Sequence, residues 1–355
     1  MRVLLTGAAG FIGSTIVDAL IDRGDDVVTL DLLLPMAHGS VVPEWAPDDL
    51  IVGDLRNPDL VRTILGGVDV VCHQAAMVGL GVHAADAPDY AAHNVQATAV
   101  LLAGMAEAGI SRLVQASSMV VYGEGRYRCE RHGDVRPPAR SPESLSAGRF
   151  DPLCPICGAA LSWAAISEDA RLDPRNTYAA SKLAQEHFAS AWSGQTDSSV
   201  TSLRYHNVYG PRMPRDTPYA GVAALFRSAL EAGQPPRVYE DGGQMRDFIH
   251  VLDVAAANVA AIDRLVSSPP PAGGEALALN VSSGDPHSVG DMAVELAMAM
   301  NGPAPEVVGG GRPGDVRHVV ADPARAAAIL GFHARIAFAD GVRAFATAPM
   351  RAPVV

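Results

Sequence analysis

The sequence contains no run of basic residues, and its formal net charge at pH 7 is −12. A chain with this charge balance is not expected to bind nucleic acid or an anionic membrane surface. No apolar stretch approaches the length of a membrane span, and Gly7 breaks the apolar start, which therefore does not resemble a signal peptide. Internal repeats are also lacking. These absences favour a cytoplasmic protein, and its 355 residues can form one large or two modest domains.

A glycine-rich turn near the N-terminus is the first positive feature. An apolar run over residues 2–6 leads into Gly7, Gly10 and Gly13, and a helical pattern of apolar residues follows. Gly7 and Gly10 let the backbone turn tightly and approach a pyrophosphate at the N-terminus of the helix, and Gly13 lets helix and strand pack closely. This strand–turn–helix context predicts a dinucleotide-binding site.

An acidic residue ends the second predicted strand. Residues 26–31 have strand character, and Asp31 stands at their carboxyl end. A carboxylate at this position can accept hydrogen bonds from the adenosine ribose hydroxyls and would repel a 2′-phosphate. The sequence therefore predicts NAD, in preference to NADP, as the cofactor.

Strand and helix patterns alternate over the first 205 residues. The predicted strands lie near residues 2–6, 26–31, 50–53, 69–73, 112–117 and 200–205. Alternation of this kind predicts an α/β protein with a Rossmann-type doubly wound parallel sheet and right-handed crossovers. Residues 206–355 are mixed and are expected to form a smaller C-terminal substrate domain. A ligand cleft is expected beyond the carboxyl ends of the strands, between the two domains.

A tyrosine and a lysine four residues apart point to acid–base chemistry. Tyr178 and Lys182 would lie on one face of a helix, one turn apart. A phenol is almost never ionised at neutral pH, but a fixed cation nearby favours the phenolate, so the pair can act as a general base. Ser118, at the end of a predicted strand, can reach the same cleft.

The glycine spacing together with Tyr178 and Lys182 resembles the extended short-chain dehydrogenase/reductase superfamily. Further motifs resemble its nucleotide-sugar epimerase/dehydratase branch, over nearly the whole chain. These motifs are Gly53-Asp-Leu55, His73-Gln-Ala-Ala76, Ser117-Ser-Met-Val-Val-Tyr-Gly123, Leu203-Arg-Tyr-His-Asn-Val-Tyr-Gly-Pro-Arg212, Arg246-Asp-Phe-Ile-His-Val251 and Gly311-Arg-Pro-Gly-Asp315.

The resemblance implies roles for residues at the matching positions. It places Ser118, Tyr178 and Lys182 in catalysis. It implies NAD contacts, beyond Tyr178, Lys182 and the glycines, from Phe11, Ile12, Asp31, Asp54, Leu55, Gln74, Ala75, Ala76 and Asn94. It implies nucleotide-sugar contacts from Asn207, Arg212, Arg246, Arg312 and Asp315, where arginines suit phosphate because their planar fork donates two hydrogen bonds. It further implies that residues 246–265 return to the first domain, and that a homodimer forms through helices near 89–108 and 176–193.

The implied reaction is 4-epimerisation of a nucleotide sugar. Tyr178 would remove the sugar 4-hydroxyl proton while the C4 hydride moves to NAD, and the hydride would return to the other face of the 4-keto sugar. Sugar 4,6-dehydratases of the family carry Asp-Glu directly after the catalytic Ser/Thr. Met119 and Val120 stand there in this chain and cannot transfer a proton. A 4-keto-sugar reductase and a non-catalytic nucleotide-sensing protein are the alternatives.

Residues 124–172 depart from most relatives as an insertion, and three of the chain's 4 cysteines lie in it. Cys154-Pro-Ile-Cys157, followed by glycine, has the form of a metal knuckle, because its tight turn aims both thiolates at one point. Cys129 and His132 can complete a closed, structural Cys3His zinc site. A redox pair and unliganded thiols are the rival interpretations. A cysteine-bearing loop here resembles a subgroup assigned as dTDP-L-rhamnose 4-epimerases, which favours a dTDP-6-deoxyhexose, although nothing separates uridine from thymidine.

Overall fold

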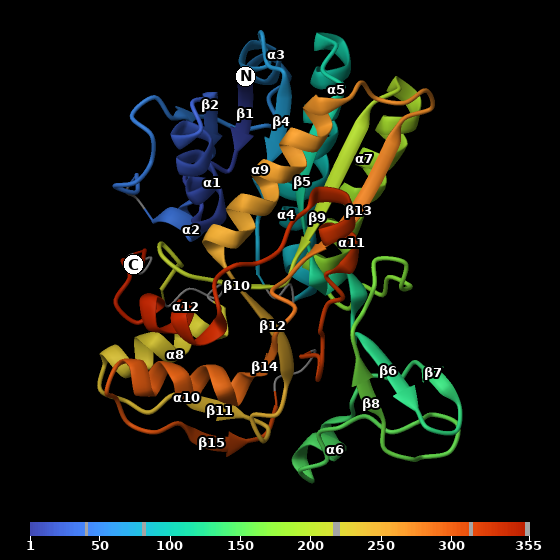
Figure 1. Cartoon of the computed structure of the whole chain (residues 1–355), viewed down its shortest axis with the longest axis vertical. Coiled ribbons are helices and arrows are strands. Elements are labelled where there is room, and N and C mark those ends of the chain that lie inside the picture. Colours follow the sequence, from blue (N-terminus) through green and yellow to red (C-terminus); the bar gives the residue numbers. More distant parts are fainter. Residues whose placement is uncertain (40–41, 80–82, 216–220, 312–314, 352–355) are drawn as a thin grey trace.

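The computed structural model of the protein describes residues 1–39, 42–79, 83–215, 221–311 and 315–351. Its largest unit is a parallel 7-stranded sheet with the order β13-β9-β5-β4-β1-β2-β3 (Figure 1). Its strands are β1 Arg2–Thr6, β2 Asp26–Asp31, β3 Ile51–Val52, β4 Val70–His73, β5 Arg112–Ser118, β9 Ser199–Tyr205 and β13 Glu275–Val281. The Rossmann-type doubly wound sheet predicted from the sequence is confirmed.

Every strand expected from the alternating pattern is present in this sheet, with ends shifted by at most a residue or so. The seventh strand, β13, was not expected. It comes from the part of the chain beyond residue 206 and pairs with β9 along its whole length, from Glu275 opposite Ser199 to Val281 opposite Tyr205. The central sheet therefore draws on both halves of the sequence.

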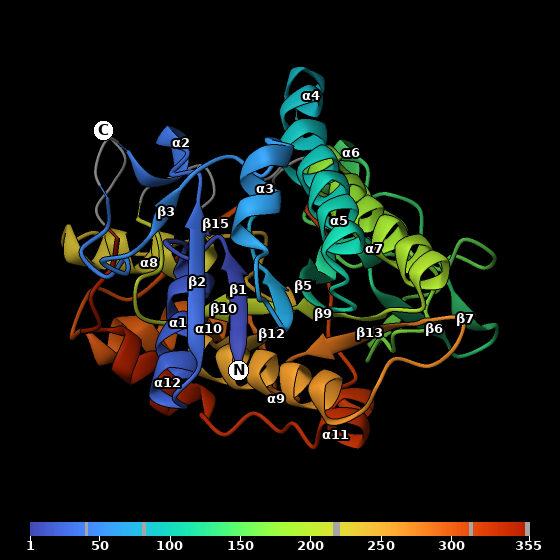
Figure 2. The ribbon, with the colours of Figure 1, turned by 90° about the horizontal axis from the view of Figure 1, so that it is seen from above.

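Helices cover both faces of the central sheet (Figure 2). One face carries α1 Phe11–Asp22, α9 Val251–Ser267 and α11 Ala324–Leu330, and the other carries α3 Pro58–Ile64, α5 Ala97–Ala108 and α7 Thr177–Thr196. Residues such as Ile16, Leu203 and Ile262 fill the first interface, and Leu4, Leu101 and Trp192 fill the second. Helix α9 thus packs on the sheet although it follows strands of the smaller unit in sequence.

A smaller mixed unit lies beyond one end of the sheet (Figure 1). It contains β10 Asn207–Tyr209, β12 Met245–His250 and β14 Pro286–Ser288 in one sheet, and β11 Arg237–Tyr239 and β15 Glu306–Gly309 in another. Its helices are α8 Val222–Glu231, α10 Val289–Ala299 and α12 Phe338–Phe345. Phe248, Leu296 and Phe345 belong to its own hydrophobic core, which is separate from those of the central sheet.

The insertion forms a third, small unit that projects from the rest of the chain (Figure 1). Its strands are β6 Arg126–Cys129, β7 Gly133–Val135 and β8 Ser162–Ala164, in the antiparallel order β7-β6-β8, and its one described helix is α6 Pro142–Ser146. Two other short helices are α2 Pro35–His38, which borders the cleft described below, and α4 Ala87–Tyr90. Among the described helices, none combines the length and apolarity that crossing a bilayer requires.

Candidate active site

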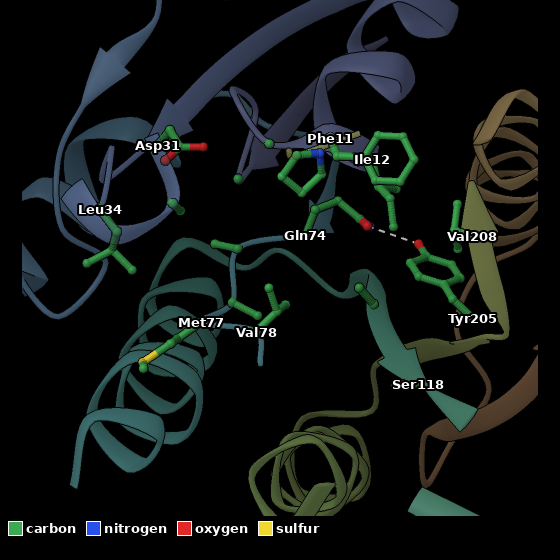
Figure 3. A pocket seen from close by; sticks show the side chains of 18 of the residues that line it. Phe11, Ile12, Asp31, Leu34, Gln74, Met77, Val78, Ser118, Tyr205 and Val208 are labelled. Carbon is green, nitrogen blue, oxygen red and sulfur yellow. Dashed lines mark hydrogen bonds between the residues drawn. The ribbon is translucent and has the colours of Figure 1, made fainter. Parts of the chain in front are cut away.

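A pocket of about 400 Å³ lies at the carboxyl ends of the central strands. The chain segments that follow β1, β2, β4, β5 and β9 form most of its lining, and the smaller unit closes it with residues that include Val208, Met213 and Phe248. Figure 3 shows Asp31 and Leu34 at one end and Ser118, Tyr205 and Val208 at the other. Open α/β sheets bind ligands at this edge, so this is the candidate site.

The glycine turn after β1 has the backbone geometry of a dinucleotide cradle. Gly7 has a φ of +72°, and a Cβ there would come within 2.7 Å of the Ala75 amide nitrogen. At Gly13 a Cβ would lie 2.0 Å from the Gly7 carbonyl oxygen. Gly10 precedes α1 and gives it no side-chain cap, so the N–H groups of the first turn stay available to an anion.

Asp31 is fixed beside the glycine turn, at the end of the pocket away from Ser118 (Figure 3). One carboxylate oxygen accepts from the Ala9 amide at 3.0 Å and the other from the Leu33 amide at 2.8 Å. These bonds turn the carboxylate into the pocket, where its remaining lone pairs can accept from ribose hydroxyls.

The position of Asp31 leads to a prediction about the affinity for NAD and the preference for NAD over NADP. Asp31→Asn removes the charge that would repel a 2′-phosphate and weakens the acceptor, so we expect NAD affinity to fall about 10-fold and the NAD-to-NADP preference to narrow. Titration of the cofactor-depleted variant with each dinucleotide measures both. An unchanged preference would show that Asp31 does not face the ribose. Asp59→Asn, on exposed α3, is the matched control.

All but one of the residues expected to contact NAD line this pocket. They are Gly7, Gly10, Phe11, Ile12, Gly13, Asp31, Asp54, Leu55, Gln74, Ala75, Ala76, Tyr178 and Lys182. Asn94 does not line it. Its side chain is fully buried and bonds both the amide and the carbonyl of Met77, at 2.7 and 2.9 Å, and the Ser181 hydroxyl at 2.8 Å. Asn94 therefore ties the loop after β4 to α7.

Several lining residues were not expected from the sequence. Leu34, Ala37 and His38 come from α2 and its approach, and Arg351 comes from the far end of the chain. The Arg351 guanidinium donates to the Ala9 carbonyl at 2.9 Å and to the Ala37 carbonyl at 3.0 Å. No local motif marks these positions, because only tertiary folding brings them to the pocket.

Strand β5 and helix α7 bring the three expected catalytic residues together. The Asn176 side chain caps α7 by accepting from the Ala179 amide at 2.8 Å, which fixes where the helix begins. Tyr178, in its first turn, is hydrogen-bonded to Ser118 at the end of β5. Lys182, the only lysine in the sequence, donates from Nζ to the Ala116 carbonyl at 3.0 Å.

The pKa of Tyr178 differs from the expectation that Lys182 lowers it. Burial raises the pKa of Tyr178 to about 12, against the opposite effect of its hydrogen bond with Ser118. Burial also lowers the pKa of Lys182 to about 7, partly offset by Glu186. Tyr178 is thus a poor base in the protein alone, because Lys182 points to a carbonyl and burial outweighs any attraction from it.

The pocket wall near Ser118 is polar at several fixed points. Gln74 accepts from the Tyr205 hydroxyl at 2.9 Å, as Figure 3 shows. His206 and Asn207 line the pocket between β9 and β10. Burial lowers the pKa of His206 to about 3, so its ring is neutral at physiological pH. The buried Asn207 amide oxygen has no hydrogen-bond partner among the described residues, which leaves it available to a ligand.

Two of the three arginines expected to contact the nucleotide sugar, Arg212 and Arg246, do not line the pocket. Arg212 pairs with Asp18 of α1 at 2.7 Å and lies over the Trp45 ring, so its charge is already neutralised at the surface. Arg246 donates to three backbone carbonyls, those of residues 245, 316 and 317. Asp315 is at the start of the segment that Arg246 holds, and Arg312 lies outside the described residues.

The four expected metal ligands of the insertion lie together. The donor atoms of Cys129, His132, Cys154 and Cys157 are all within 4.8 Å of one another. His132 Nδ1 is 3.5 Å from the sulfurs of Cys129 and Cys154, and the sulfurs of Cys129 and Cys157 are 3.8 Å apart. Gly158 has a φ of +70° and donates its amide to the Cys154 carbonyl at 2.8 Å, which closes the turn.

Comparison with known proteins agrees with this geometry. The model of the NAD dependent epimerase/dehydratase family matches residues 3–144 and 157–275. The chain is 34% identical to a dTDP-L-rhamnose 4-epimerase of Burkholderia thailandensis, over 96% of this chain and 93% of that protein.

Two solved structures extend the likeness to the fold. MoeE5, in complex with UDP-glucuronic acid and NAD, is 32% identical with a TM-score of 0.74, and the match covers 98% of both chains. The UDP-glucose 4-epimerase of Thermus thermophilus, in complex with NAD, is 29% identical with a TM-score of 0.74 and the same coverage. With its glycine cradle, its Ser118–Tyr178–Lys182 group and these matches, the chain belongs to the NAD dependent epimerase/dehydratase family.

Proposed function

We propose that the protein is an NAD-dependent 4-epimerase of a dTDP- or UDP-hexose. The observation that carries this proposal is one pocket that joins the glycine cradle and Asp31 to Ser118, Tyr178 and Lys182. The relatives named above include 4-epimerases of both nucleotide classes. The dTDP-L-rhamnose relative, and the apolar Met77, Val78 and Phe248 in the pocket wall, favour a 6-deoxyhexose.

The cofactor fits the residues present. The cradle of Gly7, Gly10 and Gly13 admits a pyrophosphate, since a side chain at Gly7 or Gly13 would collide with backbone, and Asp31 offers acceptors to a ribose. When bound, NAD supplies the oxidant at the sugar C4 and the hydride for its re-reduction, and its positive ring favours an ionised Tyr178.

Residues of the protein itself transfer the proton of the sugar 4-hydroxyl. Tyr178 takes the proton of the 4-hydroxyl, and Ser118, already hydrogen-bonded to it, bridges the two oxygens. Lys182 can exchange its bond with Ala116 for the nicotinamide ribose and stays close to Tyr178. A 4-keto sugar that turns over in the pocket receives the hydride on its other face, and Tyr178 returns the proton.

Two features separate this reaction from its neighbours in the family. Met119 and Val120, in the short turn after β5, offer no acid or base for dehydration. Asp31 opposes the 2′-phosphate that an NADPH-dependent 4-keto-sugar reductase would need to bind. The reductase stays the second candidate because it would use the same Ser118, Tyr178 and Lys182.

A direct assay decides between these functions. The purified protein is incubated with UDP- and dTDP-hexoses without added cofactor, and the configuration at C4 is followed by NMR. The epimerase converts one of these sugars to a mixture of C4 epimers. Inert sugars, together with NADH consumption on an added 4-keto sugar, would instead establish the reductase.

We further propose that the insertion holds a structural zinc ion. In a tetrahedral site with Zn–S of about 2.3 Å and Zn–N of about 2.0 Å, donor atoms are about 3.5–3.8 Å apart. The separations of His132 from Cys129 and from Cys154, and of Cys129 from Cys157, have this size, and all four donor atoms lie within 4.8 Å of one another. Four protein ligands leave no open position, so the ion would stabilise the insertion and not take part in the reaction.

Location and assembly are also proposed. Four free cysteines, three of them in the proposed zinc site, suit a reducing compartment, and we propose the cytoplasm.

We propose a homodimer through the outer faces of α5 and α7, where Phe188 is 47% exposed. Sedimentation equilibrium of the wild type and of Phe188→Glu tests this assembly, since a monomeric wild type excludes it.

A further inference from the structure

Buried charges join the insertion to the smaller unit. Arg140, in the insertion, donates to Glu240 at 2.7 Å, and Arg317 donates to the same carboxylate at 2.9 Å. All three side chains are at most 5% exposed. Charges this deeply buried require close partners, and removing one partner is costly, so this junction has a defined geometry.

Further contacts from the insertion converge on residues 315–318. Arg140 also donates to the Asp315 carbonyl at 2.7 Å, and the exposed Asp151 accepts from Arg317 at 2.8 Å. The hydroxyl of the buried Tyr127 accepts from the backbone amide of residue 318 at 3.1 Å. The Glu124 carboxylate also accepts from the Arg317 amide at 3.2 Å, so this segment is bonded to four separate points of the insertion.

The same segment also faces β12. Arg246 donates to the Val316 carbonyl at 2.7 Å and to the Arg317 carbonyl at 2.8 Å, and forms a backbone bridge with Val319. Arg246 and Asp315 are two of the five residues expected to contact the nucleotide sugar. Asp315 begins the segment, which thus lies between Arg246 and the insertion, and its position depends on both.

The insertion has little hydrophobic core with which to keep its own shape. Over residues 126–164, all of them described, the buried residues are Tyr127, Cys129, Pro137, Pro152 and Cys154. Tyr127 shares β6 with the proposed ligand Cys129, and Asp151 precedes the ligand Cys154 by three residues. A metal ion on these cysteines would therefore fix the groups that hold residues 315–318.

We propose that the zinc-held insertion positions the nucleotide half of the substrate by fixing residues 315–318 through Arg140, Asp151 and Tyr127. The inference depends on the proposed function and on the prediction that Asp315 and Arg246 contact the nucleotide. Arg140, Asp151 and Tyr127 are positioning residues. No residue of the insertion lines the pocket that contains the glycine cradle and Tyr178, so cofactor binding and the chemical step are independent of it.

Arg140→Met tests this proposal. The variant leaves Arg317 on Glu240, so the carboxylate keeps a cation and the chain should fold. We expect isothermal titration to show Kd values for UDP and dTDP at least about 10-fold above wild type, the loss of one charge-assisted hydrogen bond. Bound NAD per chain and kcat at saturating sugar should stay within about twofold. Arg128→Met, whose exposed side chain pairs only with Asp134 among the described residues, is the matched control.

Removal of zinc is the second test of this proposal. Protein stripped by a chelator should lose nucleotide affinity as Arg140→Met does, and combining the two should add little, because both act through residues 315–318. Asp151→Asn replaces Arg140→Met if that variant does not fold. Unchanged Kd values after loss of zinc and in Arg140→Met, with only the melting temperature lowered, would overturn the proposal. A wild type that binds NAD but neither nucleotide would overturn the proposed function as well.

Discussion

Phenylalanine in place of Tyr178 should lower kcat by about 10³-fold, because a positioned general base typically contributes 10²–10⁴-fold. The substitution removes one oxygen and keeps the ring, which packs at 5.9 Å from the ring of Tyr90. The pocket should therefore keep its shape, and KM for the sugar should change little. The measurement is the rate of C4 interconversion by NMR, with saturating nucleotide sugar.

Two controls make the Tyr178 result specific. NAD released from denatured variant and wild type should be equal, because the glycine cradle and Asp31 are untouched. Tyr90→Phe removes a neighbouring hydroxyl that helps to raise the pKa of Tyr178 but leaves the Tyr178 oxygen in place, so its kcat should not fall more than about twofold below wild type. Residual activity in Tyr178→Phe above about a tenth of wild type would mean that another group takes the proton.

Loss of the metal ion proposed for the insertion is the second large effect that we expect. Cys157→Ser replaces a thiolate by a poor zinc ligand, and structural zinc contributes about 10–16 kcal/mol of apparent binding energy in small zinc-dependent domains. Zinc per chain should fall from about 1 to near zero. Residues 126–164 should become sensitive to protease, since they bury few side chains of their own.

Cys72 provides the matched control for the metal. Its thiol is buried at the end of β4, and burial raises its pKa to about 12, so it is neither a ligand nor a reactive group. Cys72→Ser should keep the full zinc content and the protease resistance of the insertion. Wild-type protein purified without any metal, or Cys157→Ser with undiminished zinc, would contradict the Cys3His site.

The sequence predicts the parallel sheet because its strands follow one another with regular helical crossovers. Strand β13 was not predicted, because its place in the sheet depends on pairing with β9, some seventy residues earlier in the chain. Helix α9 was placed by family resemblance alone. Where an element's position is set by distant partners, local pattern does not reveal it.

The site was predictable wherever backbone geometry dictates the residue. Gly7 and Gly13 allow no side chain, and Asp31 must follow β2, so spacing alone locates them. The contacts of Asn94 with NAD and of Arg212 with the nucleotide sugar stay predictions. The structure adds partners within the protein that spacing does not reveal, since Asn94 is bonded to Met77 and Arg212 pairs with Asp18.

The pKa of Tyr178 could not be predicted from its spacing to Lys182 in the sequence. Tyr178 and Lys182 lie one turn apart, as expected, yet the pKa of Tyr178 moves upward, to about 12. Whether a cation lowers a neighbour's pKa depends on burial and on where its ammonium points, here to the Ala116 carbonyl. The cluster of Cys129, His132, Cys154 and Cys157 was predictable because the Cys-x-x-Cys turn brings two of its sulfurs together locally.

The central claim is reversible oxidation at C4 with return of the same hydride, and isotope labelling tests it most directly. The nucleotide sugar found active in the assay is prepared with deuterium at C4 and incubated with the protein in ordinary water, without added cofactor. We predict that both C4 epimers retain the deuterium, as read by NMR. Hydrogen in place of deuterium at C4 of the product would contradict the account.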